Sequence, residues 1–235
     1  AIQSGFRVTL RDVEDRFLQH ARARIDAALK KLVDDGKISE DQKADMLKQL
    51  ITTTNLAEMK SADFVVEAAP EDFGVKKAIF HELDKTCRAS AILATNTSSI
   101  SITKIAATTR RPDKVIGMHF MNPVPVLQLV EVIRGVETSP ETAAATHDFA
   151  KRLGKTAVEA ADFPGFLANR ILMPMINEAI FALMEGVGTV EAIDTVMRLG
   201  MKHPMGPLAL ADLIGLDVCL AVLRTLQEGL GDPKY

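Results

Sequence analysis

The chain has 235 residues, a net charge of −3, a sequence pI near 6.0, two cysteines and no tryptophan. At roughly 100–200 residues per domain, this length allows one large domain or two smaller ones. A hydrophobic content of 47% with 25% charged residues is ordinary for a soluble globular protein and excludes wholesale disorder. The near balance of charge argues against nucleic acid as a partner, and no apolar run reaches the ~18 residues of a membrane span. Cys87 and Cys219 make no disulfide framework, which favours a reducing compartment such as the cytoplasm.

A strand and two helices are predicted at the start of the chain. Residues 6–12 alternate in polarity, as in a short strand, and end on the acid Asp12. Residues 14–35 contain no glycine or proline and carry apolar residues at helical spacing, so we expect a helix that ends at Gly36. A second helix is expected over residues 39–50, because Ser39 is followed three residues later by Gln42, as in a capping box.

Strands and helices then alternate. Compact apolar runs at residues 63–69 and 91–95 predict strands buried on both faces, with a helix over residues 74–85 between them. The further expected elements are strands at 115–120, 127–133 and 156–159 and helices at 101–107 and 139–153. This alternation predicts an α/β domain of the Rossmann type, with a mostly parallel sheet covered on both faces.

The pattern changes after the Pro-Gly pair in residues 162–165. Helical periodicity fills residues 166–185, 189–199 and 207–229, and no strand candidate lies between them. Pro-Gly is a common linker signal. We therefore expect an α/β domain at residues 1–161 and an all-helical domain at residues 162–235.

Polar residues that directly follow buried strands are the first functional candidates, because open α/β sheets bind ligands at the carboxyl ends of their strands. Asp12 follows the first strand and suits the ribose hydroxyls of a dinucleotide, although an N-cap of the next helix is an equal alternative. Glu71 follows the strand at 63–69 and could also reach ribose hydroxyls, with Lys76 one turn onward near a phosphate. Taken alone, Glu71 is better explained as a solvated helix start.

The loop Asn96-Thr97-Ser98-Ser99 offers four small polar side chains after a strand. They could surround a substrate oxygen or a cofactor amide, or they could cap the following helix. Ser98 lies outside any G-x-S-x-G context, which disfavours a serine hydrolase.

His119 and Glu131 form the strongest candidate pair. His119 ends the strand at 115–120, and Glu131 interrupts the apolar strand at 127–133, where an unpaired carboxylate is costly. A His–Glu pair removes that cost, and a carboxylate partner suits a histidine that transfers protons. Asn169, after the linker, could hold a carbonyl oxygen or cap the backbone. No spacing of Cys and His suits a metal site.

Five runs occur together in one order: residues 94–100 (ATNTSSI), 117–123 (GMHFMNP), 129–133 (LVEVI), 164–170 (PGFLANR) and 203–207 (HPMGP). Through them the chain resembles the short-chain L-3-hydroxyacyl-CoA dehydrogenases over essentially its whole length, and especially the bacterial 3-hydroxybutyryl-CoA dehydrogenases. The resemblance implies an NAD-dependent, reversible oxidation of a 3-hydroxyacyl-CoA to the 3-oxoacyl-CoA. NADP stays an alternative, because Arg11 precedes Asp12.

The same resemblance implies roles for single residues. His119 matches the catalytic base and Glu131 its carboxylate partner, while Ser98 and Asn169 match residues that contact the substrate. The positions that match cofactor contacts are Asp12, Glu71, Lys76 and Asn96. The helical half resembles a dimerisation domain, and residues 166–184 suit its interface. Basic residues of the first helix are candidates for the CoA nucleotide: Arg22, Arg24, Lys30 and Lys31.

Two other functions stay open from sequence. One is a non-catalytic binding or structural member of the fold, similar to lens crystallin relatives; the joint presence of Ser98, His119, Glu131 and Asn169 speaks against it. The other is a sister dehydrogenase that acts on a sugar acid. The resemblance also implies a strand and a G-x-G-x-x-G turn before Ala1 and further helix beyond Tyr235, so we expect the chain to be part of a longer protein.

Overall fold

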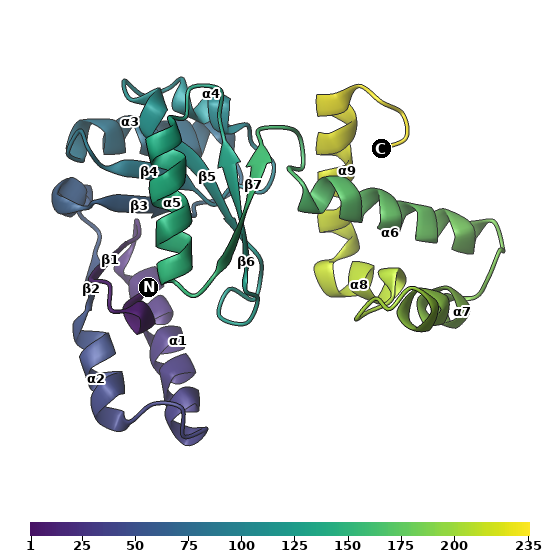
Figure 1. The fold of residues 1–235 in the computed structure, drawn as a ribbon, viewed down its shortest axis with the longest axis horizontal. Helices are drawn as coiled ribbons and strands as arrows, with labels where there is room; N and C mark the ends of the chain where they lie inside the picture. The colour runs from purple at the N-terminus through teal and green to yellow at the C-terminus, as the bar shows by residue number, and fades with distance from the viewer. The chain divides into compact units, whose positions relative to one another are not determined.

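A computed structural model describes all 235 residues and divides them into two compact units. The first unit comprises Ala1–Asn96 and Ile102–Glu159, and the second comprises Thr97–Ser101 and Ala160–Tyr235. Each unit is described by itself below, with element labels as in Figure 1.

A five-stranded sheet forms the centre of the first unit, in the order β3-β4-β5-β6-β7. Its strands are β3 (Phe64–Glu67), β4 (Ile92–Thr95), β5 (Val115–Phe120), β6 (Leu129–Arg134) and β7 (Thr156–Ala161). Strands β3, β4 and β5 are parallel, and β6 returns antiparallel to β5. The predicted Rossmann-type, mostly parallel sheet is therefore confirmed.

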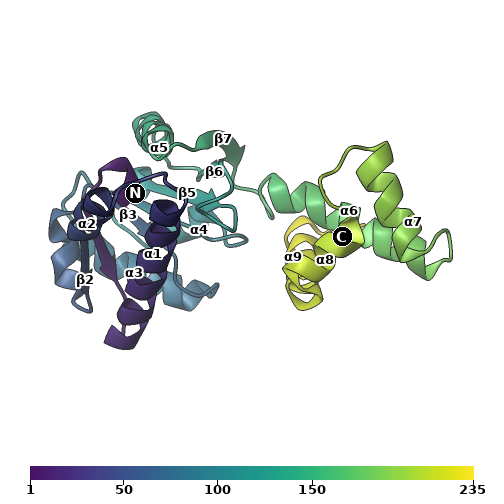
Figure 2. The same cartoon turned by 90° about the horizontal axis from the view of Figure 1, so that it is seen from below.

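Helices cover both faces of this sheet (Figures 1 and 2). On one face, α5 (Pro140–Arg152) packs Ala143 and Ala150 against inward side chains of the strands. On the other face lie α3 (Phe73–Thr86) and α4 (Ile102–Ala106). Helix α4 approaches β5 at Gly117, where a Cβ would lie 2.8 Å from both Ile102 Cδ1 and Ile133 Cβ. The glycine therefore sets how closely α4 can pack on the sheet.

A second, two-stranded parallel sheet joins β1 (Val8–Arg11) to β2 (Leu50–Thr53). Along the chain, β1 and β2 are separated by α1 (Asp15–Asp34) and α2 (Glu40–Lys48), which lie side by side in Figure 1. An ion pair of 3.0 Å from Lys43 Nζ to Asp26 Oδ1 joins the two helices. The predicted capping box is present: Gln42 N donates to Ser39 Oγ, and Ser39 N donates to Gln42 Oε1. Three short 3₁₀ helices complete the unit at Ile2–Ser4, Leu56–Ser61 and Pro112–Lys114.

Three expectations are wrong. The second helix ends at Lys48 rather than residue 50, because Leu50 and the β-branched residues after it form β2. Strand β3 is not buried on both faces, because its Val66 is 38% exposed. The helix expected over residues 207–229 is broken at Gly215, whose φ of 100° lies outside helical geometry.

The second unit contains four α-helices: α6 (Ala168–Met184), α7 (Val190–Thr195), α8 (Pro207–Ile214) and α9 (Leu216–Leu230). A π-helical turn at Val196–Gly200 follows α7. The core of the unit is made by Met173, Ile176, Ala211, Cys219 and Leu226. The carboxylate of Asp194 caps α8 by accepting hydrogen bonds from Leu208 N at 2.9 Å and Ala209 N at 3.0 Å. No helix of the protein combines the length and apolar character that a membrane crossing requires.

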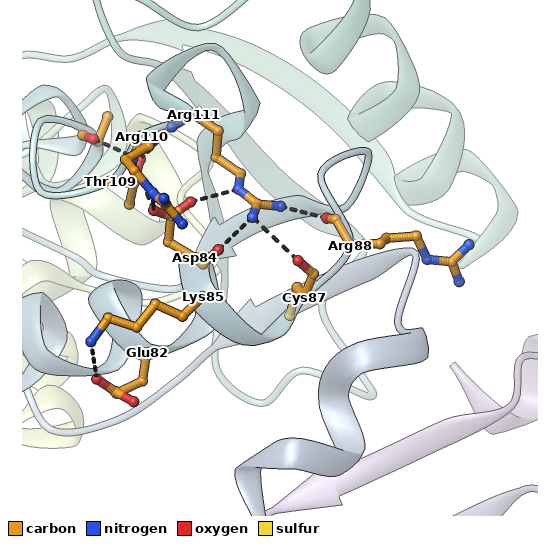
Figure 3. Close-up of polar contacts among 9 residues, drawn as sticks. Glu82, Asp84, Lys85, Cys87, Arg88, Thr109, Arg110 and Arg111 are labelled. Atoms are coloured by element: carbon orange, nitrogen blue, oxygen red, sulfur yellow. Dashed lines mark hydrogen bonds and ion pairs between the residues drawn. The ribbon is translucent and has the colours of Figure 1, made fainter.

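A buried carboxylate ties the end of α3 to the segment before β5 (Figure 3). Asp84 is 4% exposed, and its oxygens accept hydrogen bonds from Arg111 Nε at 2.7 Å, Arg110 Nε at 3.2 Å and Arg110 N at 3.0 Å. Arg111 also donates to the carbonyl oxygens of Asp84, Cys87 and Arg88. Burial opposes the charge of Asp84, but the hydrogen bonds from the two arginines outweigh it and lower the pKa of this carboxyl.

Acid should therefore weaken the fold through Asp84. A carboxyl whose pKa is lower in the folded state stabilises above its unfolded pKa of about 3.9, and this contribution is lost as the pH falls through the folded value. We expect Asp84→Asn to lower the free energy of unfolding by about 2 kcal/mol at pH 7. The deficit should shrink as the pH falls below about 4, first because the carboxyl of the unfolded wild-type chain becomes protonated and then, at lower pH, because that of the folded protein does. Urea unfolding from pH 7 to pH 3 measures this difference in the free energy of unfolding. The control is Asp45→Asn, because Asp45 forms an exposed ion pair with Lys48 on the surface of α2. A deficit that is independent of pH would contradict this account.

Candidate functional site

His119 and Glu131 face each other on the neighbouring strands β5 and β6. They are direct partners in the antiparallel register, two positions from the pair Gly117 and Ile133. Because side chains alternate along a strand, all four residues point to the sheet face that carries α4. The histidine Nδ1 lies 2.7 Å from Glu131 Oε2, and the two residues are 7% and 2% exposed.

This contact orients the imidazole. A carboxylate can only accept from Nδ1, so the hydrogen bond selects the tautomer with the proton on Nδ1 and leaves proton exchange with a substrate to Nε2. Because both groups are buried, the carboxylate also stabilises the imidazolium that forms when Nε2 takes up a proton. The pair therefore has the chemistry of a general base that becomes a general acid in the reverse direction.

Three of the four expected cofactor residues lie at the carboxyl ends of β3 and β4 or on the following helix. Glu71, in the loop after β3, has a side chain that is 39% exposed. Asn96 follows β4, and its Oδ1 accepts a hydrogen bond of 2.9 Å from Phe120 N at the end of β5. Lys76, expected near a cofactor phosphate, is 1% exposed, and its ammonium group lies 2.9 Å from Glu67 Oε1 and 3.6 Å from Glu71 Oε2.

Asp12, the fourth, follows β1. Its Oδ1 accepts a hydrogen bond of 2.6 Å from the adjacent Val13 N, and the N-cap position of α1 is held by Glu14. The alternative of a helix cap at Asp12 is therefore wrong. Glu71, whose alternative is a solvated acid at the helix start, lies just before α3 and is partly exposed; the N-cap of that helix is Asp72, which accepts from Val75 N at 2.8 Å. The basic candidates for a CoA nucleotide (Arg22, Arg24, Lys30 and Lys31) are all exposed on α1.

The remaining candidates, Ser98 and Asn169, belong to the second unit. Ser98 lies in the segment Thr97–Ser101, where Thr97 Oγ1 accepts hydrogen bonds from Ser99 N at 3.3 Å and Ile100 N at 2.9 Å. Asn169 is the second residue of α6 and is half-buried. The end of the segment is joined to the linker by a 2.7 Å hydrogen bond from Ser101 Oγ to Asp162 Oδ2.

Sequence reasoning missed Glu67, the buried partner of Lys76. Glu67 ends β3 and is 5% exposed. Its signal was visible, because an acid interrupts the apolar run Phe64-Val65-Val66, just as Glu131 interrupts its own strand.

Comparison with known proteins places these residues in a family context. Residues 1–163 match the family described as 3-hydroxyacyl-CoA dehydrogenase, NAD binding domain, and residues 165–235 match the C-terminal domain of the same family. A probable 3-hydroxybutyryl-CoA dehydrogenase of Bacillus subtilis is 51% identical over 100% of this chain and 82% of its own length. The human mitochondrial hydroxyacyl-coenzyme A dehydrogenase is 42% identical over 97% of this chain and 74% of its own. The crystal structure of (S)-3-hydroxybutyryl-CoA dehydrogenase PaaH1 from Ralstonia eutropha has a TM-score of 0.97 and 46% identity, and covers 100% of this chain and 83% of its own.

Proposed function

The chain belongs to the 3-hydroxyacyl-CoA dehydrogenase family, and from this premise we propose that it catalyses the NAD-dependent, reversible oxidation of a short-chain (S)-3-hydroxyacyl-CoA to the 3-oxoacyl-CoA. The observation that carries the proposal is the buried hydrogen bond between His119 and Glu131. Relatives named for 3-hydroxybutyryl-CoA support a substrate with a four-carbon acyl group.

The residues present fit a nicotinamide dinucleotide. Carboxylates after β1 and β3, Asp12 and Glu71, suit the hydroxyls of two riboses, and neither is used as a helix cap. We propose that Asp12, Glu71 and Asn96 contact NAD and that Lys76, whose ammonium group is buried and hydrogen-bonded to Glu67 and Ala69 O, supports Glu71 from the interior. A carboxylate at Asp12 repels a 2′-phosphate, which favours NAD over NADP. When bound, NAD would supply the acceptor for the hydride that leaves C3 of the substrate.

The protein's own residues supply the proton chemistry. In the oxidation, Nε2 of His119 removes the proton of the 3-hydroxyl group, and Glu131 stabilises the resulting imidazolium through Nδ1. In the reduction, the same imidazolium returns the proton to the 3-oxo oxygen. We assign Ser98 to that substrate oxygen and Asn169 to the thioester carbonyl, and the exposed basic residues of α1 to the CoA phosphates.

NADH oxidation followed at 340 nm with acetoacetyl-CoA tests the function in the full-length protein. We expect turnover that requires both the acyl-CoA and NADH. NADH binding without turnover would instead favour a non-catalytic binding protein. Turnover of a sugar acid but not of acetoacetyl-CoA would favour the sister dehydrogenase.

We further propose that the α/β half, residues 1–161, is the cofactor domain and that residues 162–235 form a helical domain that joins two copies of the chain. Compact clustering of Ala160–Tyr235 supports this division. Support for a homodimer comes from large apolar side chains of the second unit that are at least 57% exposed, namely Phe163, Ile171, Met184, Val187, Val196, Leu199, Met201, Leu213 and Leu216. The two free, buried cysteines support a cytoplasmic location.

A further inference from the structure

Glu67, which the catalytic scheme does not use, is a fully hydrogen-bonded carboxylate in the interior. Its Oε1 accepts from Ala69 N at 2.5 Å and from Lys76 Nζ at 2.9 Å. Its Oε2 accepts from Thr95 Oγ1 at 2.7 Å and from Lys76 Nζ at 3.1 Å. Thr95 is its register partner on β4, so the contact is built into the pairing of the two strands. Such a network is rigid, because every acceptor site is matched by a donor that the fold itself positions.

Lys76 sits between two carboxylates. Its ammonium group donates to both oxygens of Glu67 and to Ala69 O at 3.1 Å, and it lies 3.6 Å from Glu71 Oε2. With 1% of its surface exposed, Lys76 would be costly to bury as a cation without Glu67. The side chain of Glu71 is much more exposed than that of Glu67, at 39% against 2%. The buried carboxylate of Glu67 therefore holds the positive charge of Lys76 close to the exposed carboxylate of Glu71.

Glu67 also fixes the neighbouring strand end. Its carbonyl oxygen accepts a hydrogen bond of 2.7 Å from Asn96 N, and Asn96 in turn accepts from Phe120 N with its side chain. The Glu67 carboxylate is therefore linked to Glu71 through Lys76, whereas its link to Asn96 is a main-chain bond of strand pairing.

We propose that Glu67 is a positioning residue for the cofactor: its carboxylate holds the charge of Lys76 close to Glu71 and so sets where Glu71 meets the dinucleotide. The proposal rests on the assignment of the cofactor residues under Proposed function. It predicts an effect on cofactor binding and none on the chemical step, since His119 and Glu131 lie on other strands.

Glu67→Gln in the full-length protein tests this role. Glutamine keeps the shape of the side chain but leaves Lys76 with Glu71 as its nearest carboxylate, so the ammonium group should draw Glu71 away from its wild-type position. We expect the Kd for NADH, measured by fluorescence titration, to rise about 10-fold, as for the loss of one hydrogen bond to a charged group. The kcat at saturating NADH and the KM for acetoacetyl-CoA should each stay within about 3-fold of wild type.

Asp84→Asn is the matched control, because Asp84 is also a buried carboxylate of this unit, with arginine partners at the opposite end of α3. It should lower the Tm while leaving the Kd for NADH within about 2-fold. Because Glu67 acts through Lys76, adding Glu67→Gln to Lys76→Met should cause no further loss of NADH binding. This double variant removes both charges and therefore provides the test if Glu67→Gln alone does not fold.

Several results would overturn the proposal. One is a wild-type Kd for NADH in the folded Glu67→Gln protein or in the double variant. Another is a loss of NADH affinity in Asp84→Asn that equals the loss in Glu67→Gln. If the wild-type protein itself does not bind NADH, the proposed function fails and the positioning role with it. If the wild-type protein binds NADH and Glu67→Gln binds it equally well, only the positioning role of Glu67 fails.

Discussion

His119→Ala is expected to lower kcat by about 10²–10⁴-fold, because the substituted protein has no group at that position to exchange a proton with the substrate oxygen. The histidine is 7% exposed and is oriented by a 2.7 Å contact to Glu131, so water that enters the space left by the ring lacks both its basicity and its fixed position. The KM values should change much less than kcat, because the proton is in transfer only in the transition state. NADH oxidation at 340 nm with acetoacetyl-CoA measures the effect.

The control for this substitution is another histidine of the same unit. His81 is exposed on α3, and His81→Ala should leave kcat unchanged. Because His119 is buried, the Tm of His119→Ala must be measured to show that the loss is not due to unfolding. A folded His119→Ala protein with the wild-type rate would remove His119 from the mechanism.

The His119–Glu131 contact could be predicted because two independent features of the sequence pointed to it. Glu131 interrupts an apolar strand, which demands a buried partner, and a histidine ends the preceding strand. These strands are consecutive in the chain and pair antiparallel, so that the two residues fall directly opposite each other. Local pattern and pairing therefore agree, and little depends on the distant parts of the fold.

Glu67 was missed although the same rule applies to it. Its partner Lys76 lies at the start of the next helix, six residues after Pro70, and from sequence that lysine resembled a surface residue near a phosphate. Only the packing of α3 against the sheet points Lys76 into the interior, where Glu67 and Ala69 O accept hydrogen bonds from its ammonium group. Which face of a helix meets a sheet depends on tertiary contacts that local spacing does not specify.

Strand β2 shows a different limit. The run Ile51-Thr52-Thr53 is β-branched and suits a strand, but helical spacing upstream extended the predicted helix to residue 50. A capping box identifies where α2 begins, whereas no equally specific signal marks where it ends.

Glu131→Gln is expected to lower kcat by an amount similar to His119→Ala, about 10²–10⁴-fold. Glutamine occupies almost the same space in a site where Glu131 is 2% exposed, so packing should be retained. Its amide group can, however, donate to Nδ1, which selects the tautomer with the proton on Nε2. That nitrogen then cannot accept the 3-hydroxyl proton, and the neutral amide no longer stabilises imidazolium.

A double substitution separates this role from a structural one. If Glu131 acts only through His119, then His119→Ala/Glu131→Gln should be no slower than His119→Ala alone, because the pair functions as a unit. Additive losses would show that Glu131 has another role. Glu159→Gln is the matched control: Glu159 lies 3.5 Å from His147 in a His–Glu contact on the surface, and its replacement should leave kcat unchanged. The two contacts share their residue types and differ in burial, and burial makes the inner carboxylate effective in orienting its histidine and stabilising its charge.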